Sequence, residues 1–143
     1  MAWAAAVTNQ WLPLVPGVVM EYECDTDEGL EGTVVEVLPD VRVVDGARPG
    51  IILGADPGAH PGEAYRQEYD EGEAEDFGRA LDLGNDVVVP WDTSAGCLRT
   101  EDWNALEPGG REHKYYCPGV GLVREADAAL GERAGELVSV TGP

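Results

Sequence analysis

Short segments that alternate apolar and polar residues recur along this chain, and Gly and Pro residues separate them. The clearest one covers residues 18–24, where Met20, Tyr22 and Cys24 lie on one side and glutamates on the other. Successive side chains of a β-strand point to opposite faces of the sheet, so this period of two predicts a half-buried strand.

Further segments with the same character follow. They cover residues 33–38, 41–44, 63–69, 72–84, 87–89, 96–103, 111–117, 121–125 and 135–140, with a Pro- and Gly-rich loop over 45–62. Segment 72–84 also contains good helix formers, but the turn-like sequences on both sides of it favour a strand. The sequence therefore predicts an all-β protein with little helix: an antiparallel curved sheet or a small barrel of about eight or nine short strands.

The chain has 143 residues, enough for one domain with one core. We expect a single β domain over residues 11–143, preceded by a disordered or tag-like segment at 1–10. Nine Lys and Arg oppose 28 Asp and Glu, a net charge of −19, so nucleic acid and anionic membranes are excluded as partners. No apolar run reaches the roughly 20 residues that span a bilayer.

Three groups of motifs are distinctive. They are WLPLVPG at 11–17, YRQEY at 65–69 with GEAED at 72–76, and EHKYY at 112–116 with PGVGLV at 118–123. In these motifs the chain resembles a family of bacterial secreted or lipoprotein-like β domains of unassigned function. The likeness touches most of the chain and is most specific over 49–125. It implies a β fold and an extracytoplasmic location, but no reaction.

One departure from this family concerns its central strands. Members carry several additional strands before the segment that starts at Ala47, whereas this chain has only Asp45-Gly46 there. The resemblance thus implies a sheet with unpaired edges, and since a second chain can pair with such edges we expect a homodimer. The N-terminal residues lack a basic region and a full apolar segment, so we expect a natural precursor to carry an export signal that they do not contain.

The three cysteines, Cys24, Cys97 and Cys117, show no CxxC spacing. Two interpretations stay open: buried small side chains, or one disulfide that leaves a third thiol free. A disulfide would suit an exported protein, because such bonds persist in oxidising compartments. A catalytic thiolate has less support, since an acidic chain offers few cations to lower a thiol pKa.

His60 and His113 are the two histidines, and His113 lies on the predicted strand 111–117. Alternation places His113 and Tyr115 on one face of that strand. A cofactor-free enzyme could use His113 as acid or base, Tyr115 as hydrogen-bond donor and Glu68 to orient a substrate. The alternative is a histidine packed beside a core aromatic residue.

Tyr and Trp have an apolar body and a polar tip, which suits the wall of a ligand pocket. The candidate ligand-binding residues are Tyr65, Arg66, Tyr69, Trp91 and Trp103. Core packing explains single members of this set equally well. Binding of a small organic molecule or a partner protein is our first hypothesis and catalysis the alternative, so the sequence leaves open whether the protein is an enzyme.

Acidic residues are dense between Glu63 and Asp76, where seven carboxylates accompany one cation, Arg66. Ca²⁺ could bind if several of these carboxylates converged, but their spacing is not that of an EF-hand loop. A solvated hairpin tip is the simpler interpretation. We therefore predict no resident metal or other cofactor, with Ca²⁺ as the alternative.

Overall fold

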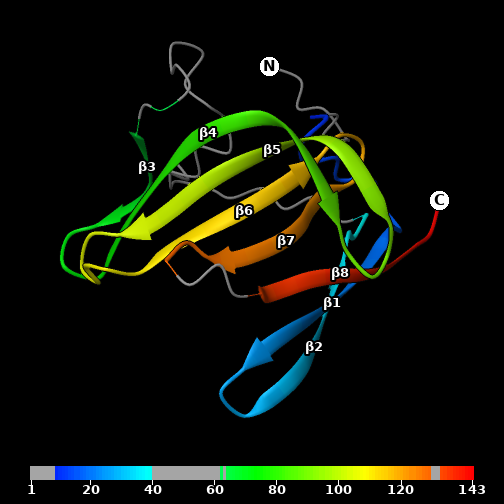
Figure 1. Cartoon of the computed structure of the whole chain (residues 1–143), viewed down its shortest axis with the longest axis horizontal. Coiled ribbons are helices and arrows are strands. Elements are labelled where there is room, and N and C mark those ends of the chain that lie inside the picture. The colour runs from blue at the N-terminus through cyan, green and yellow to red at the C-terminus, as the bar shows by residue number, and fades with distance from the viewer. Residues whose placement is uncertain (1–8, 40–61, 63, 130–132) are drawn as a thin grey trace.

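The computed structural model describes residues 9–39, 62, 64–129 and 133–143. Eight strands form one antiparallel sheet in the order β2-β1-β8-β7-β6-β5-β4-β3 (Figure 1). They are β1 (Val19–Thr26), β2 (Gly29–Glu36), β3 (Ala64–Asp70), β4 (Ala74–Val88), β5 (Thr93–Asn104), β6 (Arg111–Cys117), β7 (Gly121–Asp127) and β8 (Arg133–Thr141). The all-β prediction is confirmed, including the strand assignment within 72–84.

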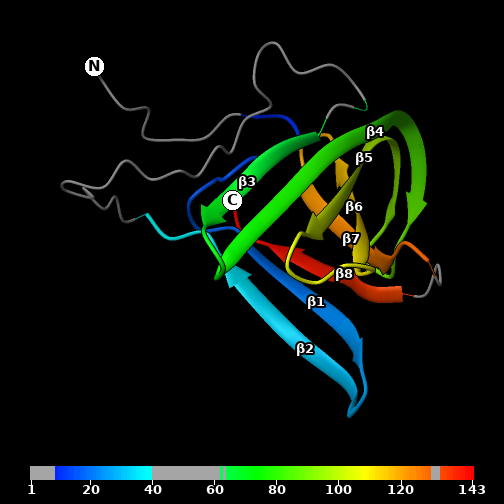
Figure 2. The ribbon, with the colours of Figure 1, turned by 90° about the vertical axis from the view of Figure 1, so that its left-hand side faces the viewer.

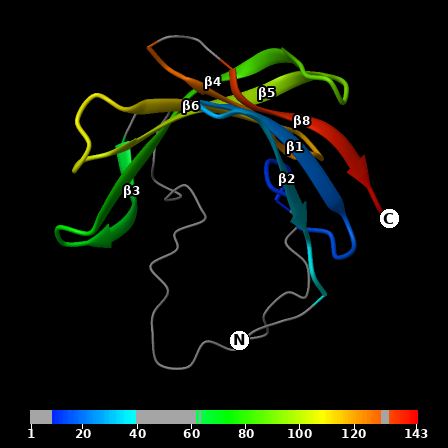
Figure 3. The ribbon, with the colours of Figure 1, turned by 90° about the horizontal axis from the view of Figure 1, so that it is seen from below.

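The sheet is an open arch (Figure 3). Its two edge strands, β2 and β3, follow each other in the sequence but lie at opposite ends of the strand order. The alternative of a closed barrel is wrong for the described residues, because closure requires the edge strands to pair and no ladder joins these two. The predicted strand 41–44, most of the loop 45–62, and residues 1–8 lie outside the described residues.

The longest strands replace predicted short ones. A turn near Gly84 was expected to separate two strands, but β4 continues through it for 15 residues and pairs with the 12 residues of β5. Three register shifts between β4 and β5, together with the positive φ of 85° at Gly84, bend the strand without ending it. The far end of this hairpin reaches β8, where the Trp91 N–H donates to the Leu137 carbonyl at 3.1 Å.

The buried core lies where the β4–β5 hairpin approaches the strands around β8. Its members are Met20, Val87, Val89, Cys97, Cys117, Val123 and Leu137, with Trp91 and Tyr115 packed against them. Cys97 and Cys117 form a disulfide between β5 and β6, with a Cα–Cα distance of 4.3 Å. Of the two interpretations of the cysteines, the disulfide is therefore correct, and Cys24 remains free and half-buried.

The β1–β2 hairpin projects from one end of the arch (Figure 2). The segment before β1 is tied to it, because the Gly17 N–H donates to the Val37 carbonyl at 2.8 Å. It is also tied to the β6–β7 turn, where the Gly119 N–H donates to the Gln10 carbonyl at 2.8 Å. These bonds hold Leu12–Leu14 beneath the arch. The described residues include no helix long and apolar enough to cross a membrane.

Candidate functional site

The register of the strands gives the sheet two chemically different faces. One row of neighbours runs across five strands: Thr100, Lys114, Glu125, Gly135 and Cys24. We call the face that carries this row the lysine face. His113 alternates to the opposite side of β6, where it lies between Glu101 and Ala126, and we call that side the histidine face.

An apolar pocket of about 360 Å³ opens on the lysine face. Its described lining residues come from the N-terminal segment, from β1 and β2 and from the β6–β8 region: Leu12, Pro13, Leu14, Met20, Tyr22, Cys24, Thr33, Val35, Val37, Val120, Gly121, Leu122, Arg124, Glu125 and Gly135. The N-terminal segment lies under the arch beside β1 and β2 (Figure 3), so the lysine face is the inside of the arch. The predicted grouping of Met20, Tyr22 and Cys24 on one face is confirmed.

On the lysine face, Gly135 of β8 makes room for the side chain of Cys24, its neighbour on β1. A Cβ added at Gly135 would lie 3.0 Å from the Cys24 Sγ atom, closer than ordinary packing allows. The missing side chain thus leaves room for the thiol at the pocket wall. It also leaves the Glu125 side chain without a bulky neighbour on β8.

Glu125 and Tyr22 are the ionisable groups that burial affects in this pocket. Burial raises the pKa of Glu125, and its neighbour Lys114 only partly offsets this effect. Burial, followed by the negative charge of Glu125, raises the pKa of Tyr22 to about 12. The Tyr22 hydroxyl donates to the Leu122 carbonyl at 2.9 Å. At neutral pH the tyrosine is therefore neutral and holds β1 to β7.

Lys114 connects this pocket to a second one. Its Nζ atom lies 2.9 Å from Asp102 Oδ2 and 4.0 Å from Glu125 Oε1. Burial alone would lower the pKa of Lys114, but the hydrogen bond and the charge of Asp102 outweigh it and raise that pKa. Lys114 is therefore a permanent cation, and Asp102 is its closer counter-ion.

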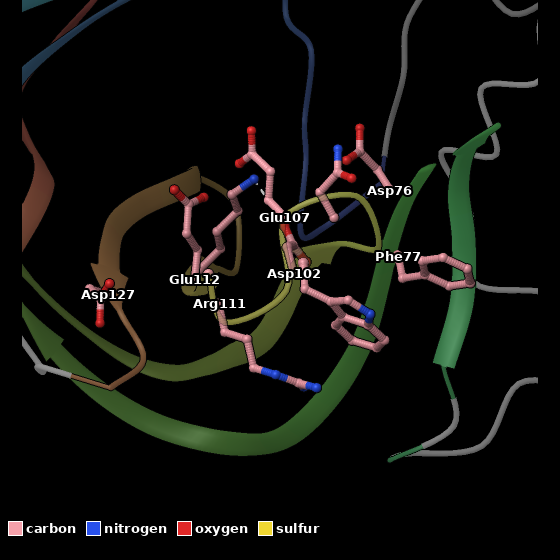
Figure 4. A pocket seen from close by; sticks show the side chains of 11 residues that line it. Asp76, Phe77, Asp102, Glu107, Arg111, Glu112 and Asp127 are labelled. Carbon is pink, nitrogen blue, oxygen red and sulfur yellow. Dashed lines mark ion pairs between the residues drawn. The ribbon is translucent and has the colours of Figure 1, made fainter. Parts of the chain in front are cut away.

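The second pocket is acidic and has a volume of about 410 Å³. Five carboxylates, two cations and two aromatic rings contribute to its wall: Asp76, Asp102, Glu107, Glu112 and Asp127, with Arg111, Lys114, Phe77 and Trp103. Figure 4 shows Asp76, Glu107 and Glu112 on one side, while Arg111 points away from Glu112. Arg111 instead crosses to the histidine face, as strand alternation requires.

The histidine face holds the predicted catalytic pair in a different setting from the one expected. His113 and Tyr115 do share this face, and among the described side chains the carboxylate beside His113 is that of Glu101, whose Oε2 lies 3.4 Å from Nε2. Arg79 and Arg111 both donate to Glu101 Oε1, at 2.7 and 2.6 Å. These donors outweigh burial and lower the pKa of Glu101. Neither His113 nor Tyr115 is among the described lining residues of the two pockets.

The predicted aromatic residues occupy separate places. Trp103 stacks on Phe77 with ring centroids 5.7 Å apart, and the Arg111 guanidinium lies 4.8 Å from its centroid. Trp91 packs against the core, and the Arg124 guanidinium lies 5.8 Å from the Tyr115 ring. The structure thus brings Trp103 to the acidic pocket and keeps Trp91 away from it.

The remaining predicted site residues lie on the edge strand β3: Tyr65, Arg66, Glu68 and Tyr69. Their side chains are outside the described part of the structure. In the sheet, β4 and β5 separate β3 from β6, a backbone spacing of about 14 Å for three ladder steps. Glu68 is therefore not a sheet neighbour of His113, and Glu101 occupies that position.

The acidic segment forms a hairpin, as its simpler interpretation predicted. Asp70 pairs with Ala74 across a turn in which the Gly72 N–H donates to Glu75 Oε1 at 3.2 Å. Among the residues whose side chains are described, no three His, Cys, Asp or Glu side chains gather in a way that could hold a metal ion.

Sequence reasoning missed Glu125 and Glu101 as site residues, whereas Tyr22 belongs to the set of aromatic residues from which a pocket wall was expected. The available signal was alternation within each predicted strand, which does place Tyr22 on the apolar side of its strand. Alternation does not tell which strands are neighbours, and these residues acquire their partners from neighbouring strands.

No family model, curated protein or solved structure matches this chain.

Proposed function

We propose that this protein is an extracytoplasmic binding domain that holds a small organic molecule in the apolar pocket without converting it. The observation that carries this proposal is the pocket itself. Its volume of about 360 Å³ falls within the range of about 300–1,000 Å³ that is usual for ligand sites. Its wall is mostly aliphatic. The Glu125 carboxylate and the Tyr22 ring are the groups in the wall that would orient a ligand.

The disulfide supports the extracytoplasmic part of the proposal. Cys97 and Cys117 are bonded and fully buried, and such structural disulfides are typical of oxidising compartments. The resemblance to secreted or lipoprotein-like β domains points in the same direction. A labelled full-length precursor should therefore appear outside the cytoplasm after cell fractionation, whereas a cytoplasmic location would contradict this part.

Binding of a neutral apolar fluorophore, Nile red, tests the pocket. We expect saturable binding of one dye per chain. Val35→Asp places a charge in the pocket wall and should weaken binding at least about 10-fold. Val35 is 45% exposed and lies on an edge strand, so the variant is expected to fold.

Val34→Asp is the matched control for this test. Val34 precedes Val35 on β2, is 63% exposed and points to the opposite face. Binding should be unchanged in this variant, with thermal unfolding confirming that both variants fold. Equal weakening in the two variants, or no saturable dye binding by the parent protein, would refute the proposal.

We also propose a homodimer that forms through the sheet edges. Every residue of β2 is exposed, and within the described chain β2 pairs with β1 alone. Unpaired strand edges tend to recruit another strand. Light scattering at micromolar concentration should give the mass of two chains, and a mass of one chain would exclude the dimer.

Catalysis by His113 remains the second candidate. The His113–Glu101 contact of 3.4 Å resembles a base held by a carboxylate, which favours it. However, Glu101 is also bound by two arginines, and His113 lines neither described pocket. His113→Ala should therefore leave Nile red affinity within about twofold. Conversion of a pocket-bound compound that stops in this variant would favour the enzyme.

A further inference from the structure

The apolar pocket contains few charged or aromatic side chains that could determine which ligand it prefers. Among its described lining residues, Tyr22 is the aromatic ring and Glu125 the carboxylate. The lining also includes Arg124, whose Nε atom lies 3.7 Å from Glu136 Oε1 and whose guanidinium lies over the Tyr115 ring on the histidine face. The charge that the pocket presents to a ligand is therefore that of Glu125.

The surroundings of Glu125 leave this charge poorly compensated. Among the described side chains, the cation nearest to Glu125 is Lys114, which lies 4.0 Å from Glu125 but 2.9 Å from Asp102, so its charge is already balanced. Glu112 and Asp127 form the adjoining row beside Asp102 and add negative charge. A half-buried carboxylate with apolar neighbours is stabilised when a cation binds beside it.

A carboxylate next to an aromatic ring can bind an ammonium group, because the carboxylate and the face of the ring both attract positive charge. The aliphatic wall formed by Leu12, Leu14 and Val37 continues from this set. We infer that the pocket is selective for an organic cation with an apolar tail, such as an alkylammonium, whose nitrogen lies beside Glu125 and Tyr22. This inference rests on the proposed function.

Three probes with the same octyl tail test the charge preference: octyltrimethylammonium, octyl glucoside and octyl sulfate. In calorimetric titrations below micelle-forming concentrations, we expect the cation to bind about 10-fold more tightly than the glucoside. The sulfate should bind most weakly. Weaker binding of the uncharged octyl glucoside to Val35→Asp, with Val34→Asp as control, establishes that the tail occupies the apolar pocket.

Glu125→Gln tests whether the preference for the cationic probe comes from Glu125. This variant should reduce the advantage of the cation over the glucoside to about twofold or less. Glu36→Gln is the matched control, because it removes the same charge from an exposed position at the end of β2 that is not part of the pocket wall. The preference should persist in this control, which separates local recognition from the attraction of a chain with a net charge of −19.

The outcomes separate the two claims. If Nile red and all octyl probes fail to bind, both the proposed function and the cation inference fail. If the three probes bind equally, if the sulfate binds best, or if Nile red binds and no octyl probe does, the pocket stands and the cation inference fails. An equal loss of preference in Glu125→Gln and Glu36→Gln also overturns the inference, since it assigns the preference to overall charge.

Discussion

Two glutamates on opposite faces of the same sheet have pKa values that are shifted in opposite directions. Glu101 on the histidine face is the more buried, yet its pKa is lowered, because Arg79 and Arg111 both donate to it and His113 lies nearby. Glu125 on the lysine face is more exposed, yet burial raises its pKa, since the cation near it is engaged by Asp102. The donors around Glu101 outweigh its burial, whereas Lys114 does not outweigh the burial of Glu125.

The difference separates a structural carboxylate from one suited to binding. Glu101 has its oxygens occupied by side chains of β4 and β6 and holds these strands together. Glu125 lines a pocket, and in the described part of the structure the ion pair that it makes is the 4.0 Å contact with Lys114. A ligand cation would therefore gain more from Glu125 than from Glu101.

The largest expected effect comes from the disulfide between β5 and β6, because ion pairs of both faces cross these two strands. The Cys97→Ala/Cys117→Ala double variant should lose about 3 kcal/mol of unfolding free energy, as expected for a closed loop of this size. Urea unfolding measures this loss. Cys24→Ala provides the matched control and should retain the parent stability within about 0.5–1 kcal/mol. A double variant as stable as this control would show that the bond does not support the sheet.

Removing the charge of Glu101 should have the next largest effect. Glu101→Gln leaves Arg79 and Arg111 without their counter-ion and should cost about 2 kcal/mol, less than the 3–5 kcal/mol typical of fully buried pairs, because both guanidiniums are partly exposed. Glu125→Gln should change stability by less than about 1 kcal/mol. Chemical denaturation of both variants at pH 7 makes the comparison, and equal losses would contradict the assigned difference.

The smallest effect is the pH dependence, where the two glutamates should act with opposite sign. The folded pKa of Glu101 lies below its ordinary 4.5, so its stabilising contribution is present above that value and is lost as pH falls through the folded pKa. The folded pKa of Glu125 lies above 4.5, so protonation favours the folded state, and that contribution is lost as pH rises through the folded pKa.

Thermal midpoints between pH 3 and 7 test these signs as differences from the parent protein. The deficit of Glu101→Gln should shrink toward acidic pH, because the parent loses its advantage there. Glu125→Gln should gain relative to the parent as pH rises above about 4.5. Parallel curves for the two variants would show that the faces do not differ in this way.

Much of the local structure follows from the sequence, whereas the candidate site does not. Alternation was sufficient to place Met20, Tyr22 and Cys24 on one face and His113 with Tyr115 on one side of their strand, because side-chain direction in a strand is a local property. The turn expected near Gly84 was wrong because a glycine permits both a turn and a bent, continuous strand. Pairing with β5 selects the second.

The sequence by itself determined the all-β class, the acidic surface and the face to which most side chains point. These properties depend on composition and on spacing within single strands. The tertiary structure alone decided that Glu101 is a cross-strand neighbour of His113, and that Glu125 and Tyr22 share a pocket with Leu12–Leu14. Such neighbours come from strand order and register across long sequence separations, which no local pattern encodes.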